Sequence, residues 1–318
     1  MNSRADLLMT ASSPVPKIPV WARPRGLVLR DAEAAYLAGA ALNSLDNLVR
    51  QDVSWAGAWR QRLALQSAAA AVNLTGRHED ESALRDAHFL RGMGDDPGPA
   101  GHLLMAWRRL ASRTTHCDAE SVRPVVEQHF GLQWDEGLVE VVANAEDMVL
   151  SSRPAPVLAA EIAAAVYRAR PDAELLGFWL ADMLLAQKFR WPVPVPLLMG
   201  QVFSPVFKSG EHRKRIRPGA EGWGRAVFLA YATAAAEACD LGVELAQQAA
   251  KLITVAPKLR AKGSGDVIKL LLSDDAVPGS WSSPKLSARG ARRLFDRLGE
   301  LGAVRELSGR PTFRLYGL

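Results

Sequence analysis

The sequence predicts a mainly α-helical protein in which a large helical body precedes a smaller, basic C-terminal unit. Aromatic residues make up only 7% of the 318 residues and alanine is abundant, which favours closely packed helices. From residue 31 to residue 255, apolar residues follow the three-and-four spacing of a helix face. Strand-like patterns are almost absent before residue 303. The length exceeds that of a usual single domain and therefore predicts at least two structural units.

The helical elements are placed from their start and stop signals. Residues 1–25 contain four prolines among polar residues and show no period, so we expect a flexible N-terminal arm. Aspartates 31, 80, 118 and 135 suit helix N-caps, because a carboxylate can accept hydrogen bonds from unpaired amides. The expected helices cover residues 31–50, 55–74, 81–91, 101–113, 118–129, 135–149, 155–169, 173–189 and 221–255. Prolines 192, 194 and 196 interrupt the pattern after residue 189.

Composition predicts a soluble, cytoplasmic protein with no membrane association. The longest nearly uncharged apolar run, Ala226–Ala236, is well below the roughly 18 residues that a membrane span needs. Residues 1–17 lack the apolar segment of a signal peptide. The two cysteines, Cys117 and Cys239, are too few for a disulfide framework or a zinc site, as expected in a reducing compartment.

The distribution of charge is more informative than the net charge of +5. Residues 1–207 carry 20 Lys and Arg against 23 Asp and Glu, and residues 218–257 carry 2 against 4. Residues 208–217 carry 5 against 1, and residues 258–318 carry 12 against 6. The basic character therefore lies in one short loop and the C-terminal segment, which points to a polyanion such as nucleic acid.

The C-terminal segment has the element order of a winged helix-turn-helix. A short helix is expected at residues 266–273, and a second helix, capped by Ser287, extends to about residue 301. A two-stranded hairpin follows at residues 303–307 and 312–316. The module would normally have another helix at residues 276–285, but Pro278, Gly279 and Pro284 predict that it is shortened or distorted.

Arginines on this module predict DNA binding. In such modules the last helix enters the major groove and the wing follows the backbone. Arginine suits both positions because it forms paired hydrogen bonds with guanine or phosphate. We expect DNA contacts from Arg289, Arg292, Arg293 and Arg297 on the helix and from Arg305, Arg310 and Arg314 on the hairpin. One alternative is that Arg292, Arg293 and Arg297 are solvated surface residues paired with Asp296 and Glu300. Another is that the module binds protein.

A second basic segment, residues 208–217, lies between glycine and proline residues. Its cations are Lys208, Arg213, Lys214, Arg215 and Arg217. One interpretation is a flexible loop that contacts phosphates and strengthens the salt dependence of binding without reading sequence. The other is a solvated linker.

Three regions of the sequence carry a resemblance to a known family. The segment AGAALNSLDNLV with RQRLALQSAAAAVNLTGRHEDESALRDA, then GDDPGPAGHLLMAWRRLA, and the ending RRLFDRLGELGAVRELSGRPTFRLYGL resemble domain-of-unknown-function family 1403. The resemblance covers nearly the whole chain beyond the N-terminal arm. It implies a setting on plasmids and mobile elements of alphaproteobacteria, but no activity.

A further similarity is to Fic-domain proteins that end in a winged helix. The segments GFWLADMLLAQKFRWPVPVPLLMGQVF and WGRAVFLAYATAAAEA, followed by the basic tail, have the same order as in those proteins. An active Fic enzyme requires a His-Pro-Phe and Gly-Asn-Gly-Arg loop. The corresponding residues 170–177 lack the histidine, the asparagine and the glycine pair. The resemblance therefore implies a Fic-like scaffold without the nucleotide-transfer loop.

No other motif predicts chemistry. The acidic and histidine residues at 78–88 lack a metal-binding pattern on paired helices, so we expect neither a metal nor another cofactor. Cys117 is not expected to be a nucleophile. The sequence thus predicts an arm at 1–25, a Fic-like helical domain at 26–257 and a winged unit at 258–318. The predicted function is that of a non-enzymatic DNA-binding protein, a regulator or maintenance factor of a plasmid or mobile element. The alternatives are a protein-interaction module, with a homodimer or partner held by the helical body, and a divergent nucleotide-binding enzyme.

Overall fold

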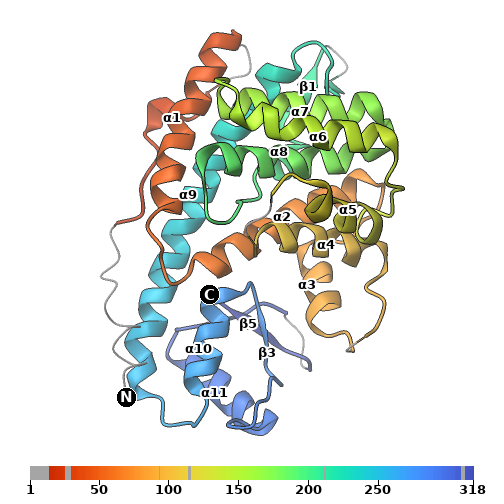
Figure 1. The fold of residues 1–318 in the computed structure, drawn as a ribbon. Helices are drawn as coiled ribbons and strands as arrows, with labels where there is room; N and C mark the ends of the chain where they lie inside the picture. The colour runs from red at the N-terminus through yellow and green to blue at the C-terminus, as the bar shows by residue number, and fades with distance from the viewer. Residues whose placement is uncertain (1–13, 26–29, 93, 114–115, 211–212, 309–311) are drawn as a thin grey trace.

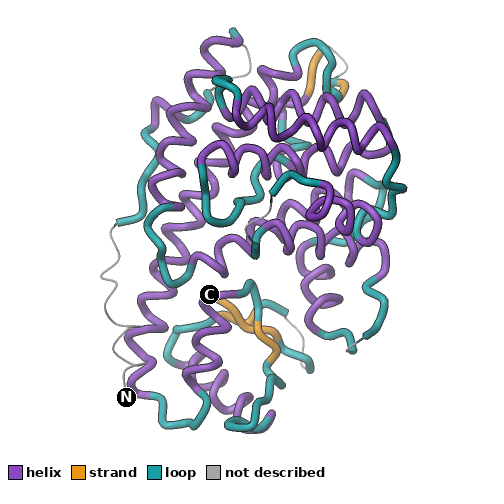
Figure 2. The backbone as a smooth tube through the Cα atoms, in the orientation of Figure 1, coloured by secondary structure: helices purple, strands orange, loops and turns teal. Residues whose placement is uncertain are grey.

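The computed structural model describes residues 14–25, 30–92, 94–113, 116–210, 213–308 and 312–318. Within these ranges the chain forms eleven α-helices and two small antiparallel sheets. Figure 1 shows a helical body with a C-terminal unit at its lower end, and Figure 2 shows the strands at opposite ends of the molecule. The prediction of a mainly helical protein is confirmed.

Nine helices make up the body. They are α1 (Asp31–Val49), α2 (Ala56–Leu74), α3 (Glu81–Phe89), α4 (Gly98–Leu110), α5 (Ala119–Gln128), α6 (Glu136–Leu150), α7 (Ala155–Ala169), α8 (Glu174–Phe189) and α9 (Trp223–Val255). Asp80, Asp118 and Asp135 each accept a hydrogen bond from the third amide that follows, so these N-caps are confirmed. The prediction for α1 is one residue late, because Arg30 occupies the N-cap position and Asp31 is the first helical residue.

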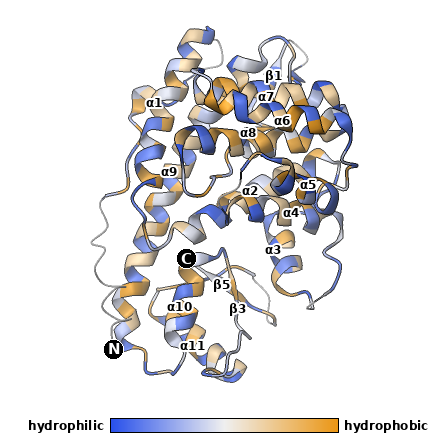
Figure 3. Ribbon diagram, in the orientation of Figure 1, coloured by the Kyte–Doolittle hydropathy of each residue, from blue (hydrophilic) through white to orange (hydrophobic). Residues whose placement is uncertain are grey.

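Helix α9 runs along the body from one sheet to the other (Figure 1). Its 33 residues span about 50 Å at 1.5 Å per residue. In the described part of the chain, the segment Trp223–Lys258 is the one helix long and apolar enough to cross a membrane, yet 67% of its apolar window is buried inside the protein. Burial of this kind is typical of a core helix. Figure 3 shows that apolar residues are also concentrated in the packed helices α6, α7 and α8.

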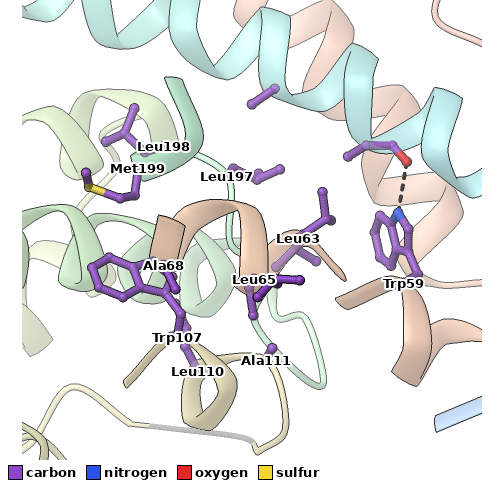
Figure 4. Packing of buried hydrophobic residues seen from close by; sticks show 14 of the residues in the cluster. Trp59, Leu63, Leu65, Ala68, Trp107, Leu110, Ala111, Leu197, Leu198 and Met199 are labelled. Atoms are coloured by element: carbon purple, nitrogen blue, oxygen red, sulfur yellow. Dashed lines mark hydrogen bonds between the residues drawn. The ribbon is translucent and has the colours of Figure 1, made fainter. Parts of the chain in front are cut away.

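Buried tryptophans connect the helices of the core. The indole N–H of Trp59 on α2 donates to the carbonyl of Ala238 on α9 at 2.9 Å, as Figure 4 shows. The indole of Trp179 on α8 donates in the same way to the carbonyl of Ala106 on α4, also at 2.9 Å. Both side chains are almost completely buried, so each fills the core while its only polar atom remains hydrogen-bonded.

A buried carboxylate anchors the proline-rich segment that follows α8. Asp182 is fully buried and accepts hydrogen bonds from the amides of Leu197 at 2.8 Å and Leu198 at 3.1 Å. The hydroxyl of Tyr231 on α9 donates to the same carboxylate at 3.1 Å. Burial raises the pKa of Asp182 to about 7, against the opposing effect of these hydrogen bonds.

Residues 14–25 pack against the body, which corrects the prediction of a flexible arm for this stretch. Ile18 and Ala22 are buried, and a 3-10 turn forms at Val20–Ala22. Arg23 forms two hydrogen bonds with the carboxylate of Asp240 on α9, at 2.7 and 2.8 Å. The prolines keep the segment extended, but its apolar residues still bury surface. The rest of the predicted arm, residues 1–13, lies outside the described residues.

The C-terminal unit combines two helices with a three-stranded antiparallel sheet. Its elements are α10 (Ser264–Ser273), β3 (Val277–Pro278), α11 (Ala288–Glu300), β4 (Arg305–Glu306) and β5 (Leu315–Gly317), with strand order β3-β5-β4. Tyr316 is the register partner of Val277 on one side and of Glu306 on the other. The predicted hairpin and the Ser287 cap are confirmed. Residues 276–285 form a strand and turns, and no helix.

Buried ion pairs fix this unit to the body. Asp275, 2% exposed, lies between the guanidinium groups of Arg62 on α2 and Arg85 on α3, with Arg85 Nε at 2.6 Å. Next to it, Asp274 forms a paired interaction with Arg108 on α4 at 2.9 Å. The C-terminal unit is therefore mounted rigidly on α2, α3 and α4, and its apolar residues continue the core of the body.

Candidate nucleic-acid interface

Helix α11 separates an apolar face from a basic face. Ser287 accepts a hydrogen bond from the amide of Gly290 at 3.2 Å, which starts the helix where the sequence predicts. One face buries the apolar side chains of Ala291, Leu294, Phe295 and Leu298. The exposed residues include all four predicted arginines, Arg289, Arg292, Arg293 and Arg297. In Figure 1, α11 lies at the end of the molecule away from α5–α8. Its four arginines are exposed to solvent there.

The four arginines differ in how they are paired. Arg297 contacts Glu300 at 2.9 Å, which partly compensates its charge. Arg292 lines a cleft between α11 and the hairpin. Within the described ranges, neither Arg289 nor Arg293 forms an ion pair, so their guanidinium groups are available to a ligand. Of the arginine pairs with Asp296 and Glu300 that the alternative predicts, the pair of Arg297 with Glu300 is present among the described residues.

The predicted hairpin arginines have separate roles. Arg305 contacts Glu244 on α9 at 2.7 Å and donates to the carbonyl of Leu318 at 3.2 Å, so it joins the hairpin to the body. Arg314 lies 3.7 Å from Glu306, and its hydrogen bond with Tyr316 raises its pKa. Arg310 lies outside the described residues. Arg305 therefore also stabilises the fold, while its side chain remains 46% exposed and its predicted DNA contact stays a prediction.

Two lysines that sequence reasoning did not select lie near the start of α11. A Cβ atom built on Gly263 would lie 3.3 Å from the Cβ of Lys285, so Lys285 and Lys262, the neighbour of Gly263, come from two segments that meet. Both lysine side chains are exposed. The turn between Ser283 and Leu286 places Lys285 against the segment that contains Gly263, and only the local excess of charge in the sequence could have indicated the two lysines.

The second basic segment lies at the opposite end of the molecule. It forms a small hairpin of β1 (Lys208–Ser209) and β2 (Lys214–Arg215), marked by the upper strands of Figure 2. Arg215 is bound through two hydrogen bonds, at 2.6 and 2.8 Å, to Glu174 at the start of α8. Arg217 lies 3.6 Å from the same carboxylate, whereas Lys208, Arg213 and Lys214 are exposed. Arg215 thus stabilises the fold and is not free for the predicted phosphate contact.

The length of α9 separates the two basic regions. The segment 208–217 lies just before its N-terminal end and the C-terminal unit follows its other end, about 50 Å away. At 3.4 Å per base pair, that separation corresponds to about 15 base pairs of duplex. The structure therefore does not gather all the predicted cations into one surface.

A model of the family described as "Protein of unknown function (DUF1403)" matches residues 6–318. The protein belongs to this family. The match to DUF1403 includes both the helical body and the C-terminal unit, so the two parts belong to one family architecture. A search of curated proteins gave no match.

In this DUF1403 protein, the polar residues at 80–88 and Cys117 are held in the fold. Asp80 caps α3, Arg85 pairs with Asp275, and burial lowers the pKa of His88 to about 3. In the described part of the chain, no group of three or more His, Cys, Asp or Glu side chains could hold a metal ion. Burial raises the pKa of Cys117 to about 12, which keeps its thiol protonated and unreactive near neutral pH.

The corner between α7 and α8 contains the residues that the Fic resemblance would align with the nucleotide loop. Arg170 there pairs with Asp135 and with Asp172. Glu174, in the first turn of α8, holds Arg215. The acidic side chains at this helix N-terminus, Asp172 and Glu174, are thus already paired with arginines of the protein itself.

Proposed function

We propose that this protein is a non-enzymatic DNA-binding protein whose C-terminal unit is a winged helix-turn-helix. Support comes from the order α10, β3, α11, β4, β5 with sheet order β3-β5-β4, in which a turn takes the place of the second helix. The observation that carries the proposal is the exposed basic face of α11, where Arg289 and Arg293 lie without ion pairs among the described residues.

In this proposal α11 enters the major groove. Arg289 and Arg293 are one helical turn apart, so their side chains follow the same face and can reach base edges or phosphates on one side of the groove. Lys262 and Lys285, near the start of α11, contact the flanking phosphates. Arg314 on the hairpin lies beside the sugar-phosphate backbone of the DNA.

The body gives the module a fixed orientation. Asp275 and Asp274 hold it through ion pairs to three body helices, and Arg305 joins the hairpin to α9. A rigid mount reduces the ordering entropy that binding would otherwise cost. We propose that the body, a Fic-like scaffold without transfer chemistry, also dimerises or binds a partner in the cytoplasm. A role in regulation or maintenance of a plasmid or other mobile element rests on the setting of the family.

One observation favours a second candidate, a protein-interaction role. Trp21 and Tyr36 are 60% and 65% exposed, and their rings stack at a centroid distance of 5.9 Å. Exposed aromatic side chains of this kind are enriched at protein interfaces. The proposed interaction surface is formed by α1 and the 3-10 turn at Val20–Ala22. Because α1 and α11 lie at opposite ends of the molecule (Figure 1), a protein partner and DNA could bind the same molecule.

Binding of the full-length protein to a random duplex at about 50 and 200 mM salt tests the proposal. An interface with about four phosphate contacts loses affinity by on the order of 100-fold over this range. We expect this salt dependence for the wild-type protein, and for Arg293→Ala a shallower slope of log affinity against log salt concentration. Truncation before residue 258 is a poor control, because it would expose the core that the C-terminal unit covers. No binding at the lower salt concentration would reject DNA binding and favour a protein partner.

A further inference from the structure

Phe313 is an exposed aromatic residue in a strained conformation. Among the described residues of the C-terminal unit it is the one large apolar side chain exposed to solvent, with 69% of its surface accessible. Its backbone φ is +57°, in the left-handed region that a bulky residue rarely adopts. The fold therefore holds an apolar ring in water on an unfavourable backbone, a combination that often marks a functional site.

The ring borders a cleft of about 420 Å³ between α11 and the hairpin. Arg292 and Asp296 line the α11 side of the cleft, and Arg314 lies on the hairpin side next to Phe313. Its size falls within the range of small-ligand pockets. The other lining residues are Gly279, Ser280, Thr312 and Tyr316.

The cleft is built by fixed contacts. The ring of Tyr316 stacks on that of Phe295 at 4.6 Å with an angle of 6° between the planes. The amide of Gly279 donates to the carbonyl of Arg314 at 2.7 Å, and a Cβ atom at residue 279 would lie only 3.0 Å from the Tyr316 ring. Glycine thus permits the close approach of β3 to β5, which preorganises the wall beside Phe313.

We propose that this cleft binds a nucleotide whose base is unstacked, held against the ring of Phe313. An aromatic ring offers a stacking face to any base. Arg292 and Arg314 supply guanidinium groups for the phosphate, and the carboxylate of Asp296 accepts a hydrogen bond from an exocyclic amino group. A base inside a duplex is covered on both faces by its neighbours, so the ligand is an unpaired nucleotide.

The inference rests on the proposed DNA binding and specifies its substrate. A duplex held by α11 would present an unpaired base to the adjacent cleft at a strand extension, a fork or a flipped position. The protein would then prefer DNA with a single-stranded segment beside the duplex. A free nucleotide has the same chemistry and is the other source of such a ligand.

Fluorescence anisotropy with two labelled DNAs tests the inference. One DNA is a blunt duplex and the other is the same duplex with a short single-stranded extension. We expect the full-length protein to bind the extended DNA about tenfold more tightly, within the range of one base–aromatic stack. Phe313→Ala should abolish this preference and leave blunt-duplex affinity unchanged, whereas Phe313→Tyr should retain it. Phe313→Gly accepts a positive φ without strain, so it should lose the preference without losing thermal stability.

The outcomes separate the two proposals. Equal affinity of the wild-type protein for both DNAs would overturn the inference while the proposed function stands. A preference that Phe313→Ala retains would overturn it as well. No binding of the wild-type protein to the blunt duplex would instead reject the proposed function. Competition with deoxycytidine monophosphate shows whether the natural ligand is an unpaired nucleotide of DNA or a free nucleotide. At concentrations that leave blunt-duplex binding unchanged, we expect no displacement of the extended DNA. Selective displacement of the extended DNA would assign the cleft to free nucleotides.

Discussion

Replacing Asp275 by alanine should destabilise the protein far more than an ordinary ion-pair deletion. The Asp275 side chain is 2% exposed, and Arg62 and Arg85, which flank it, are 11% and 9% exposed. The substitution leaves two cations in a site that water barely reaches. Removing one partner of a buried pair costs about 3–5 kcal/mol of unfolding free energy, and we expect a loss in that range.

Asp240→Ala is the matched control. Asp240 also forms paired hydrogen bonds with an arginine, Arg23, but the two side chains are 56% and 35% exposed. Solvent screening should limit its effect to about 1 kcal/mol or less. Urea denaturation followed by tryptophan fluorescence at neutral pH gives both free energies. If Asp275→Ala loses no more than Asp240→Ala, the ion pairs do not mount the C-terminal unit on the body and the argument is wrong.

The sign of the pH dependence gives an independent check of the same site. The two arginines lower the pKa of Asp275 in the folded protein despite its burial. The stability from this carboxylate is therefore present above its unfolded pKa and is lost as the pH falls through the folded value. The wild-type protein should lose more stability than Asp275→Asn between neutral and acidic pH. A constant difference between the two across this range would contradict the assignment.

Three further predictions concern single positions in the helical body. Because burial raises the pKa of Asp182 to about 7, ionisation of this carboxyl weakens folding as the pH rises from about 4 to 7. In urea titrations across that window, Asp182→Asn should therefore gain stability relative to wild type, by up to about 4 kcal/mol. A constant difference in unfolding free energy between the two proteins would argue against this. Gly57→Ala places a Cβ atom 2.6 Å from the Ser273 backbone and should lower the unfolding free energy by about 1–3 kcal/mol. Gly39→Ala, whose Cβ atom would have nothing within 4 Å, should raise it by up to about 1 kcal/mol. Thermal melts in which both variants shift in the same direction would refute the packing argument. The thiol of Cys117, with a pKa raised to about 12, should resist Ellman's reagent at pH 8 until urea unfolds the protein, and rapid native labelling would contradict this.

Local signals in the sequence were sufficient to predict most helices. Asp80, Asp118 and Asp135 each cap the helix that they were expected to start, because an N-cap depends on only a few neighbouring residues. The expected helix at 101–113 starts three residues late, because glycine and proline, here Gly98 and Pro99, usually disfavour a helix. Proline fits the first turn of a helix, where the amide hydrogen has no partner in any case.

Tertiary pairing could not be predicted from local patterns. Asp275 is 213 residues from Arg62 and 190 residues from Arg85 in the sequence, and nothing nearby indicates that they meet. Arg215 belongs to the basic segment by composition, but its contact with Glu174 makes it part of the fold. The α11 arginines could be predicted because one helix period places them opposite the apolar face. Which of these arginines lack an ion pair could not be predicted, because it depends on the residues that the fold places next to them.

The most direct test of DNA binding by α11 compares two variants with equal loss of charge. Arg289→Ala/Arg293→Ala removes two cations from α11, and Lys208→Ala/Lys214→Ala removes two from the sheet at the other end of the molecule. Affinity for one duplex is measured by anisotropy at a single fixed salt concentration. We expect at least about a tenfold loss for the α11 variant and little change for the other, because only the first loses groove contacts. Equal losses would show that general charge drives the association, and an unchanged affinity of the α11 variant would contradict the interface.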